Sequence, residues 1–168
     1  DRTSPEEINV NKSVVECGVA NEYFVVKDIV SKYYKYSGDL DIKADNIEVY
    51  RQAINEEEMK KYKEEGFWKK NQYFTVYSET TAYRYRIFSY EDAVNGGDVY
   101  KVGYQPGEEY QKFIDQMIKD SDVDTGVKPQ TSNKILTLST CTGNGYSKRL
   151  AIHAVCVDAQ TTDCLLYT

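Results

Sequence analysis

Alternating apolar and polar residues run through much of the chain, which is the pattern of half-buried strands. Residues 40–43 and 46–50 show it clearly, while residues 9–15 are predicted to form a strand and residues 22–26 to begin a short extended or turn region. Further along, residues 73–77 and 83–88 flank the polar segment Ser78–Thr81, which predicts a hairpin. Residues 134–140 and 148–157 form a last pair of predicted strands around a tight connection at 142–145.

Two stretches have helical spacing instead. Residues 108–120 place Tyr110, Phe113, Ile114, Met117 and Ile118 on one face, which predicts an amphipathic helix. Residues 55–64 are rich in Glu and Lys, with Asn55 as the expected N-cap of a shorter helix. Many strands with two or three helices between them predict a mainly β fold, most naturally a closed barrel.

Composition narrows the function classes. The 168 residues are 40% hydrophobic and 29% charged, which suits one soluble domain. The net charge of −6 and the mixing of lysines with acids argue against nucleic acid as a partner. No apolar run approaches the ~20 residues that span a bilayer, so any membrane attachment is expected outside this chain.

The cysteines and the single histidine, His153, give no metal signature. Cys17, Cys141, Cys156 and Cys164 lack CxxC spacing, so no metal or other cofactor is expected. A disulfide between two of Cys17, Cys156 and Cys164 stays open, because it depends on an oxidising compartment.

One motif points to chemistry. Residues 137–141 read TLSTC at the end of a predicted strand, and Arg149 follows on the next strand. This arrangement resembles the signature of the sortases, cysteine transpeptidases that attach surface proteins to the cell wall of Gram-positive bacteria. The serine before Thr140 resembles the class B members.

The likeness extends over residues 8–158. Residues 11–16, 21–25 and 38–43 resemble, in order, three segments of class B sortases, and the family also carries a helix before its TLxTC strand. The resemblance implies a sortase-like closed barrel of about eight strands. It implies a single domain over residues 1–168, with 159–168 as a C-terminal tail.

The chain departs from the family at its histidine. Class B sortases have a pattern like Val-Tyr-Gly-His-Asn-Met, where this chain has Val49-Tyr50-Arg51-Gln52-Ala53-Ile54. Gln52 therefore stands in the place of the catalytic histidine. An amide does not titrate near neutral pH, so it cannot protonate a leaving amine.

The resemblance implies that Cys141 is the nucleophile and that Arg149 stabilises the oxyanion or holds substrate backbone. Ser139, Thr140 and Tyr146 are the candidates for substrate contact. The groove would have residues 137–141 as its floor, with residues 108–130 and 142–146 as its walls. The implied partners are a sorting-signal peptide and a cell-wall precursor amine, at the extracellular face of the membrane or in the wall of a Gram-positive bacterium.

Three functions are compatible with these residues. The first is a degenerate sortase that is weakly active or inactive, because Gln52 replaces the histidine. The second is an active, non-standard sortase in which a water, a tyrosine or His153 supplies the proton. His153 lies four residues beyond Arg149, ~13 Å along a strand, which favours a buried core role over catalysis. The third is a non-catalytic assembly module.

Overall fold

The computed structural model describes residues 11–16, 24–27, 56–77, 81–141 and 147–161. Six strands of these residues form one mixed sheet in the order β1-β5-β6-β4-β3-β2. They are β1 (Lys12–Glu16), β2 (Phe24–Lys27), β3 (Tyr73–Tyr77), β4 (Thr81–Val94), β5 (Ile135–Cys141) and β6 (Lys148–Thr161). Strands β1 and β5 run parallel, and every other neighbouring pair is antiparallel.

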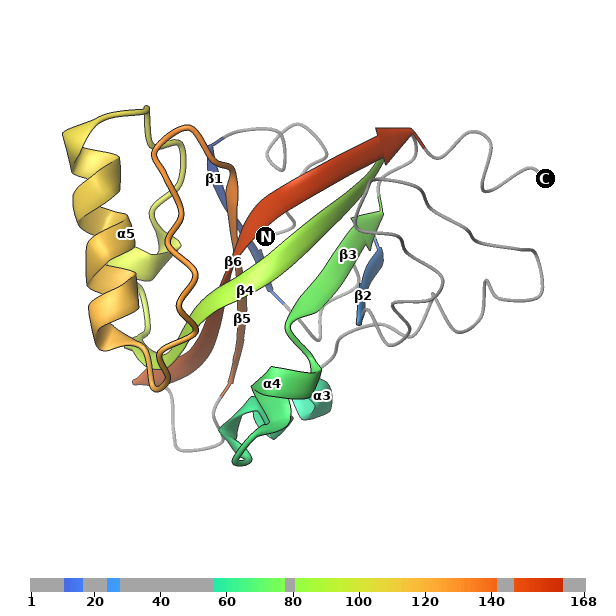
Figure 1. The fold of residues 1–168 in the computed structure, drawn as a ribbon. Helices are drawn as coiled ribbons and strands as arrows, with labels where there is room; N and C mark the ends of the chain where they lie inside the picture. Colours follow the sequence, from blue (N-terminus) through green and yellow to red (C-terminus); the bar gives the residue numbers. More distant parts are fainter. Residues whose placement is uncertain (1–10, 17–23, 28–55, 78–80, 142–146, 162–168) are drawn as a thin grey trace.

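The longest pairing joins β4 to β6, from Thr81 opposite Thr161 to Val94 opposite Lys148. Two register shifts interrupt it, between Arg84 and Tyr85 and between Ile87 and Ser89. Such irregularities bend a strand and increase its twist. These two strands cross the whole sheet diagonally in Figure 1.

The helices are α3 (Glu56–Lys60), α4 (Phe67–Lys70) and α5 (Glu108–Asp120), with short 3₁₀ turns η2 (Lys61–Lys63) and η3 (Asp98–Tyr100). Helix α5 has the predicted bounds. Gly107 precedes it with φ +145°, a backbone conformation that residues other than glycine rarely adopt. The predicted 55–64 helix is instead split, because α3 tightens into η2 after one turn; Asn55 lies outside the described residues.

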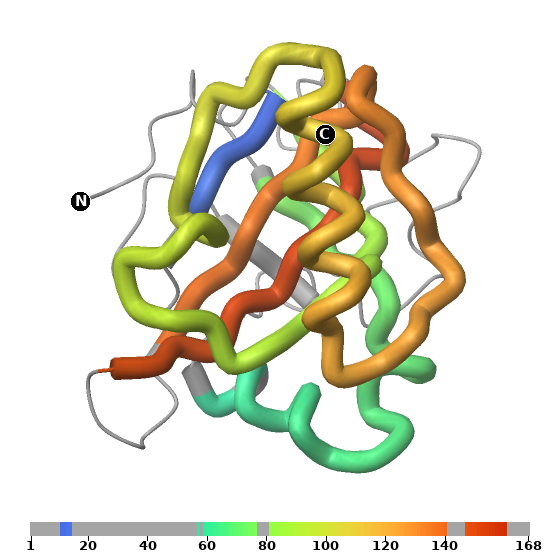
Figure 2. The backbone as a smooth tube through the Cα atoms, turned by 90° about the vertical axis from the view of Figure 1, so that its left-hand side faces the viewer, coloured from blue at the N-terminus to red at the C-terminus, as the bar shows by residue number. Residues whose placement is uncertain are grey.

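Apolar residues fill both faces of the sheet. On one face, Tyr110, Phe113, Ile114 and Met117 of α5 pack over residues of β4, β5 and β6. Figure 2 shows α5 crossing in front of these strands. On the other face, Met59 and Tyr62 cover a second cluster that contains Tyr85, Leu136 and Ile152. The sheet is therefore buried on both sides around its centre.

Several predicted strands are confirmed with longer bounds. Strand β4 continues to Val94 rather than ending at residue 88, and β6 continues to Thr161 rather than residue 157. The long β4–β6 ladder explains both extensions, because each strand supplies hydrogen-bond partners for the other. The predicted strands at 40–43 and 46–50 and the connection at 142–145 lie outside the described residues.

The fold is mainly β, as predicted. Among the described strands, β1 and β2 form opposite edges of the sheet and do not pair with each other. Closure into a barrel of about eight strands therefore stays a prediction, as does the single-domain boundary. No helix within the described ranges is long and apolar enough to cross a membrane.

Candidate active site at the end of strands β5 and β6

Cys141 and Arg149 occupy opposite positions where β5 ends and β6 begins. Their Cα atoms are direct partners in the antiparallel pairing. Facing residues in such a ladder have Cα atoms about 4.5–5.5 Å apart. Arg149 is half-buried there. The predicted backbone neighbourhood of the cysteine and the arginine is confirmed, whereas their chemical roles stay predictions.

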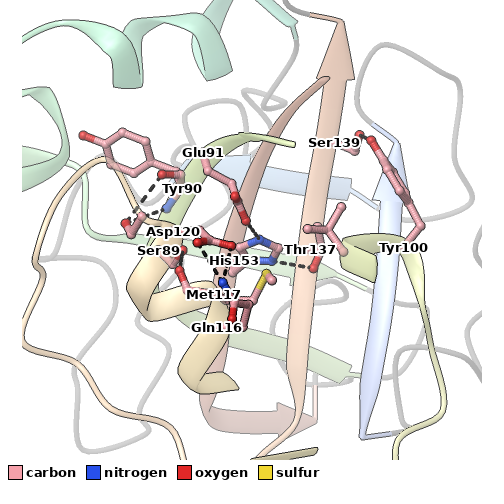
Figure 3. Close-up of polar contacts among 12 residues, drawn as sticks. Ser89, Tyr90, Glu91, Tyr100, Gln116, Met117, Asp120, Thr137, Ser139 and His153 are labelled. Carbon is pink, nitrogen blue, oxygen red and sulfur yellow. Dashed lines mark hydrogen bonds and ion pairs between the residues drawn. The ribbon is translucent and has the colours of Figure 1, made fainter. Parts of the chain in front are cut away.

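Ser139 lies two residues before Cys141, on the same strand. Its side chain is fully buried, and its Oγ lies 2.8 Å from the Oη atom of Tyr100. Tyr100 ends the 3₁₀ turn η3 and is half-buried (Figure 3). The wall beside Ser139 therefore includes η3, a segment that lies outside the predicted walls at 108–130 and 142–146.

Strand β1 holds the η3 segment in place. The Nζ atom of Lys12 donates a hydrogen bond to the carbonyl oxygen of Val99, next to Tyr100. The backbone N–H of Gly103 donates to the carbonyl of Lys12 at 3.1 Å, and Asn11 Nδ2 donates to the carbonyl of Tyr104 at 2.6 Å. Three bonds thus tie the segment after β4 to the strand that pairs with β5.

Lys12 is unusual because its side chain has 0% exposure. Its Nζ atom lies 5.2 Å from the centre of the Phe113 ring on α5. Burial disfavours the charged amine and lowers the pKa of Lys12 to about 7. Near neutral pH this amine therefore exchanges between its charged and neutral forms.

His153 sits in the middle of β6 and is also fully buried. Its Nδ1 lies 2.8 Å from Thr137 Oγ1, and its Nε2 lies 3.5 Å from Glu91 Oε1 (Figure 3). Burial lowers the pKa of His153, a decrease that Glu91 partly offsets and that the nearby charge of Lys12 reinforces. The imidazole is therefore neutral at physiological pH.

The prediction that His153 is a buried core residue is confirmed. Arg149 and His153 pair without a register break with Cys141 and Thr137, so the four-residue separation amounts to ~13 Å along the strand. The rings of Phe88 and Phe113 lie 6.1 and 6.2 Å from the imidazole, centre to centre. A catalytic base must reach within ~3 Å of the proton that it transfers, directly or through one water. His153 does not meet that requirement at Cys141.

The other candidates divide into two groups. Ser139 and Thr140 are buried as the protein stands, so contact of either side chain with a substrate stays a prediction. Gln52 and Tyr146 lie outside the described residues. Of the cysteines considered for a disulfide, Cys156 is a free, half-buried thiol whose Sγ donates to the Asp158 carbonyl; Cys17 and Cys164 lie outside the described residues.

Tyr100 and Lys12 were not among the predicted site residues. Lys12 occupies a polar position at the start of a strand, and such a position usually faces solvent. Tyr100 follows a glycine-containing turn that carries no catalytic pattern. Only the long-range packing of η3 against β1 and β5 brings them together.

Solved structures share this arrangement of strands. The sortase B of Staphylococcus aureus superposes with a TM-score of 0.55 and 20% identity, over 63% of this chain and 50% of that one. The fold is sortase-like. A Staphylococcus aureus sortase B–substrate complex gives a TM-score of 0.55 at 19% identity, over 63% and 49% of the two chains. The sortase B of Clostridium perfringens gives 0.54 at 26% identity, over 60% and 56%.

The likeness to sortases rests on the three-dimensional structure. No family model matches the chain, and no curated protein matches it. The matched region spans about half the length of the sortase B structures. At identities of this order the likeness establishes the arrangement of strands, and function has to be argued from the site.

Proposed function

We propose that this chain is a class B sortase-like protein with Cys141 as its nucleophile. The pairing of Cys141 with Arg149, where β5 ends and β6 begins, carries the proposal. Together with the sortase-like fold, it supports the interpretation of TLSTC as the family signature. We extend the proposal to the eight-strand closed barrel and to a single domain over the whole chain.

The proposed chemistry is an acyl transfer. The Cys141 thiolate attacks a peptide carbonyl, the C–N bond breaks, and an incoming amine resolves the acyl-enzyme. Arg149 presents a fixed fork of N–H donors, which suits an oxyanion or a substrate carbonyl. The proposed first substrate is the sorting-signal peptide that the resemblance to the sortases implies. A cell-wall precursor amine is the proposed acceptor, at the extracellular face of a Gram-positive cell.

Gln52 makes this a degenerate member with weak activity at neutral pH. Loss of general acid catalysis typically costs ~10²–10⁴ in rate. A thiol without an imidazolium partner keeps a pKa near ~8.5, so only a few per cent is ionised at pH 7. The groove and the nucleophile remain, while the proton donor of the family is missing.

The alkylation rate of Cys141 tests this proposal directly. Iodoacetamide labelling is followed by mass spectrometry from about pH 6 to pH 10, and Cys156 serves as an internal control. Burial raises the pKa of the Cys156 thiol, so Cys156 should label slowly throughout. We expect Cys141 to label faster than Cys156, with a rate that rises near pH ~8.5.

A second measurement examines the acyl-enzyme. A sorting-signal peptide, offered as an activated ester, should add its acyl mass to Cys141 and to no site in Cys141→Ala. Equal acylation of the Cys141→Ala protein would exclude Cys141 as the nucleophile. A Cys141 thiol that neither alkylates nor acylates would instead favour the non-catalytic assembly module.

A further inference from the structure

The hydroxyl of Tyr100 lies beside Ser139, two residues before the proposed nucleophile on β5. Residues two apart on a strand share a face and are separated by about 6.6–6.8 Å. Ser139 and Cys141 are two apart on β5, and Tyr100 Oη lies 2.8 Å from Ser139 Oγ. A tyrosine hydroxyl therefore stands beside the same-face neighbour of residue 141.

This spacing matches what a leaving group requires. Reacting atoms approach to about 3–3.5 Å, and the amide nitrogen is bonded to the carbon that the sulfur attacks. The attack distance, the C–N bond and one hydrogen bond together span about the same 6–7 Å that separate residues 139 and 141 along β5. His153 lies twice as far along the strand, and its fully buried ring is in contact with the rings of Phe88 and Phe113.

We propose that Tyr100 is the general acid of this chain, delivering to the leaving amine the proton that a histidine delivers in other sortases. The proposal rests on the function proposed above. It assigns the substitute acid to a residue on η3, a segment far in sequence from both Gln52 and Cys141.

In the acylation step, the Cys141 thiol first loses its proton to solvent, and the S–C bond forms. The amide C–N bond then breaks, its electron pair stays on nitrogen, and nitrogen takes the proton of Tyr100 Oη. The resulting phenolate regains a proton from the incoming amine when that amine attacks the thioester, so Tyr100 leaves the cycle unchanged.

The surroundings of Tyr100 suit a fixed donor. Ser139 Oγ can donate to the phenolate that forms, and the Lys12 amine holds the carbonyl just before Tyr100. Among the charged residues near it, Asp98 and Lys101 flank it in sequence, and Lys12 on β1 binds the carbonyl of Val99.

The test compares two substrates in three proteins. A sorting-signal peptide is prepared as the ordinary amide and as an ester with a nitrophenolate leaving group. Only the amide needs a proton on its leaving group. The proteins are the unmodified chain, Tyr100→Phe and the control Tyr104→Phe. Tyr104 lies four residues after Tyr100, and its ring stacks on Tyr110 and Phe113 of α5.

We expect Tyr100→Phe to cut the amide at least ~30-fold more slowly and to acylate with the ester at the unmodified rate, within about twofold. The amide rate of the unmodified protein should fall at alkaline pH, where the Tyr100 hydroxyl loses its proton, and residual cleavage in Tyr100→Phe should lack that fall. Tyr104→Phe should match the unmodified protein on both substrates. Normal ester acylation also shows that each variant is folded.

The outcomes separate the two proposals. If the ester acylates Cys141 while the amide rate is equal in Tyr100→Phe and the unmodified protein, Tyr100 is not the acid and the nucleophile stands. The same holds if the ester reacts but the amide is uncut at every pH. If the ester does not acylate Cys141 at all, the proposed function fails, and the role of Tyr100 fails with it.

Discussion

Lys12→Met tests how much the burial of the Lys12 amine beneath α5 costs in folding free energy. Burial lowers the pKa of Lys12 from 10.5 to about 7. One pKa unit corresponds to about 1.4 kcal/mol, so the charged amine costs about 5 kcal/mol of folding free energy. Methionine removes this cost at similar volume but leaves the Val99 carbonyl without its donor, a loss of about 1–3 kcal/mol. We expect a net gain of about 2–4 kcal/mol at about pH 6.

The gain should depend on pH with a definite sign. Between about pH 7 and pH 10.5 the unfolded chain keeps the Lys12 proton, whereas the folded protein has lost it. The stability of the unmodified protein therefore rises through this window by about 1.4 kcal/mol per pH unit from this group. Lys12→Met lacks that rise. Its advantage should shrink with pH and become a deficit of about 1–3 kcal/mol near pH 10.5, where only the lost hydrogen bond remains.

Urea unfolding followed by tryptophan fluorescence measures both values. From about pH 7 to pH 9 the advantage of Lys12→Met should fall by about 2 kcal/mol, because Lys12 is already half deprotonated in the folded protein at pH 7. Lys112→Met is the matched control, because Lys112 is exposed on α5 and pairs with Glu108 at 3.0 Å. Its effect on the free energy of unfolding should be small and flat with pH. A Lys12→Met advantage that is the same at both pH values would refute the reasoning.

Three further predictions concern other parts of the chain. His153→Gln keeps a hydrogen-bond partner for Thr137 but removes a titrating group. Because burial lowers the pKa of His153, the unmodified protein should lose stability as the pH falls below about 6.5. In urea unfolding, that loss should be smaller in His153→Gln by up to about 1.4 kcal/mol per pH unit. Tyr110→Phe removes the donor to the Asn11 and Asn133 carbonyls and should cost about 1–3 kcal/mol, read from the urea midpoint. Gln52→His should raise amide cleavage near pH 7 by at least ~10-fold, measured with the fluorogenic sorting peptide; an unchanged rate would argue against the alignment of Gln52 with the histidine.

The hydrophobic pattern of the sequence predicted the helices and strands whose conformation depends on residues close in sequence. The helical face of α5 and the alternation of β3 with the start of β4 are decided by neighbours in sequence, so their spacing was readable. The extension of β4 to Val94 was not, because residues 89–94 lack clean alternation. Their strand conformation comes from pairing with residues 148–153, more than 50 positions away.

The candidate site divides in the same way. Cys141 and Arg149 belong to consecutive strands, so a motif and a short connection were enough to predict that they face each other. Tyr100 and Lys12 come from segments separated by almost 90 residues. A lysine at a strand start and a tyrosine after a turn each have an ordinary solvent-exposed interpretation. Their positions depend on how β1 enters the sheet beside β5.

The energetic cost of burying Lys12 is consistent with a role for Tyr100 that requires η3 to be held in place. A methionine at this position would fill the same space without about 5 kcal/mol of desolvation penalty. What methionine cannot do is bind the Val99 carbonyl and hold η3 against β1. If Tyr100 only packed against the core, fixing η3 this tightly would gain little. If its hydroxyl must stay within hydrogen-bonding distance of a leaving nitrogen, a displacement of about 1 Å is enough to lose about 10²-fold in rate. Lys12→Met should then lower amide cleavage more than ester acylation, even though it makes the protein more stable.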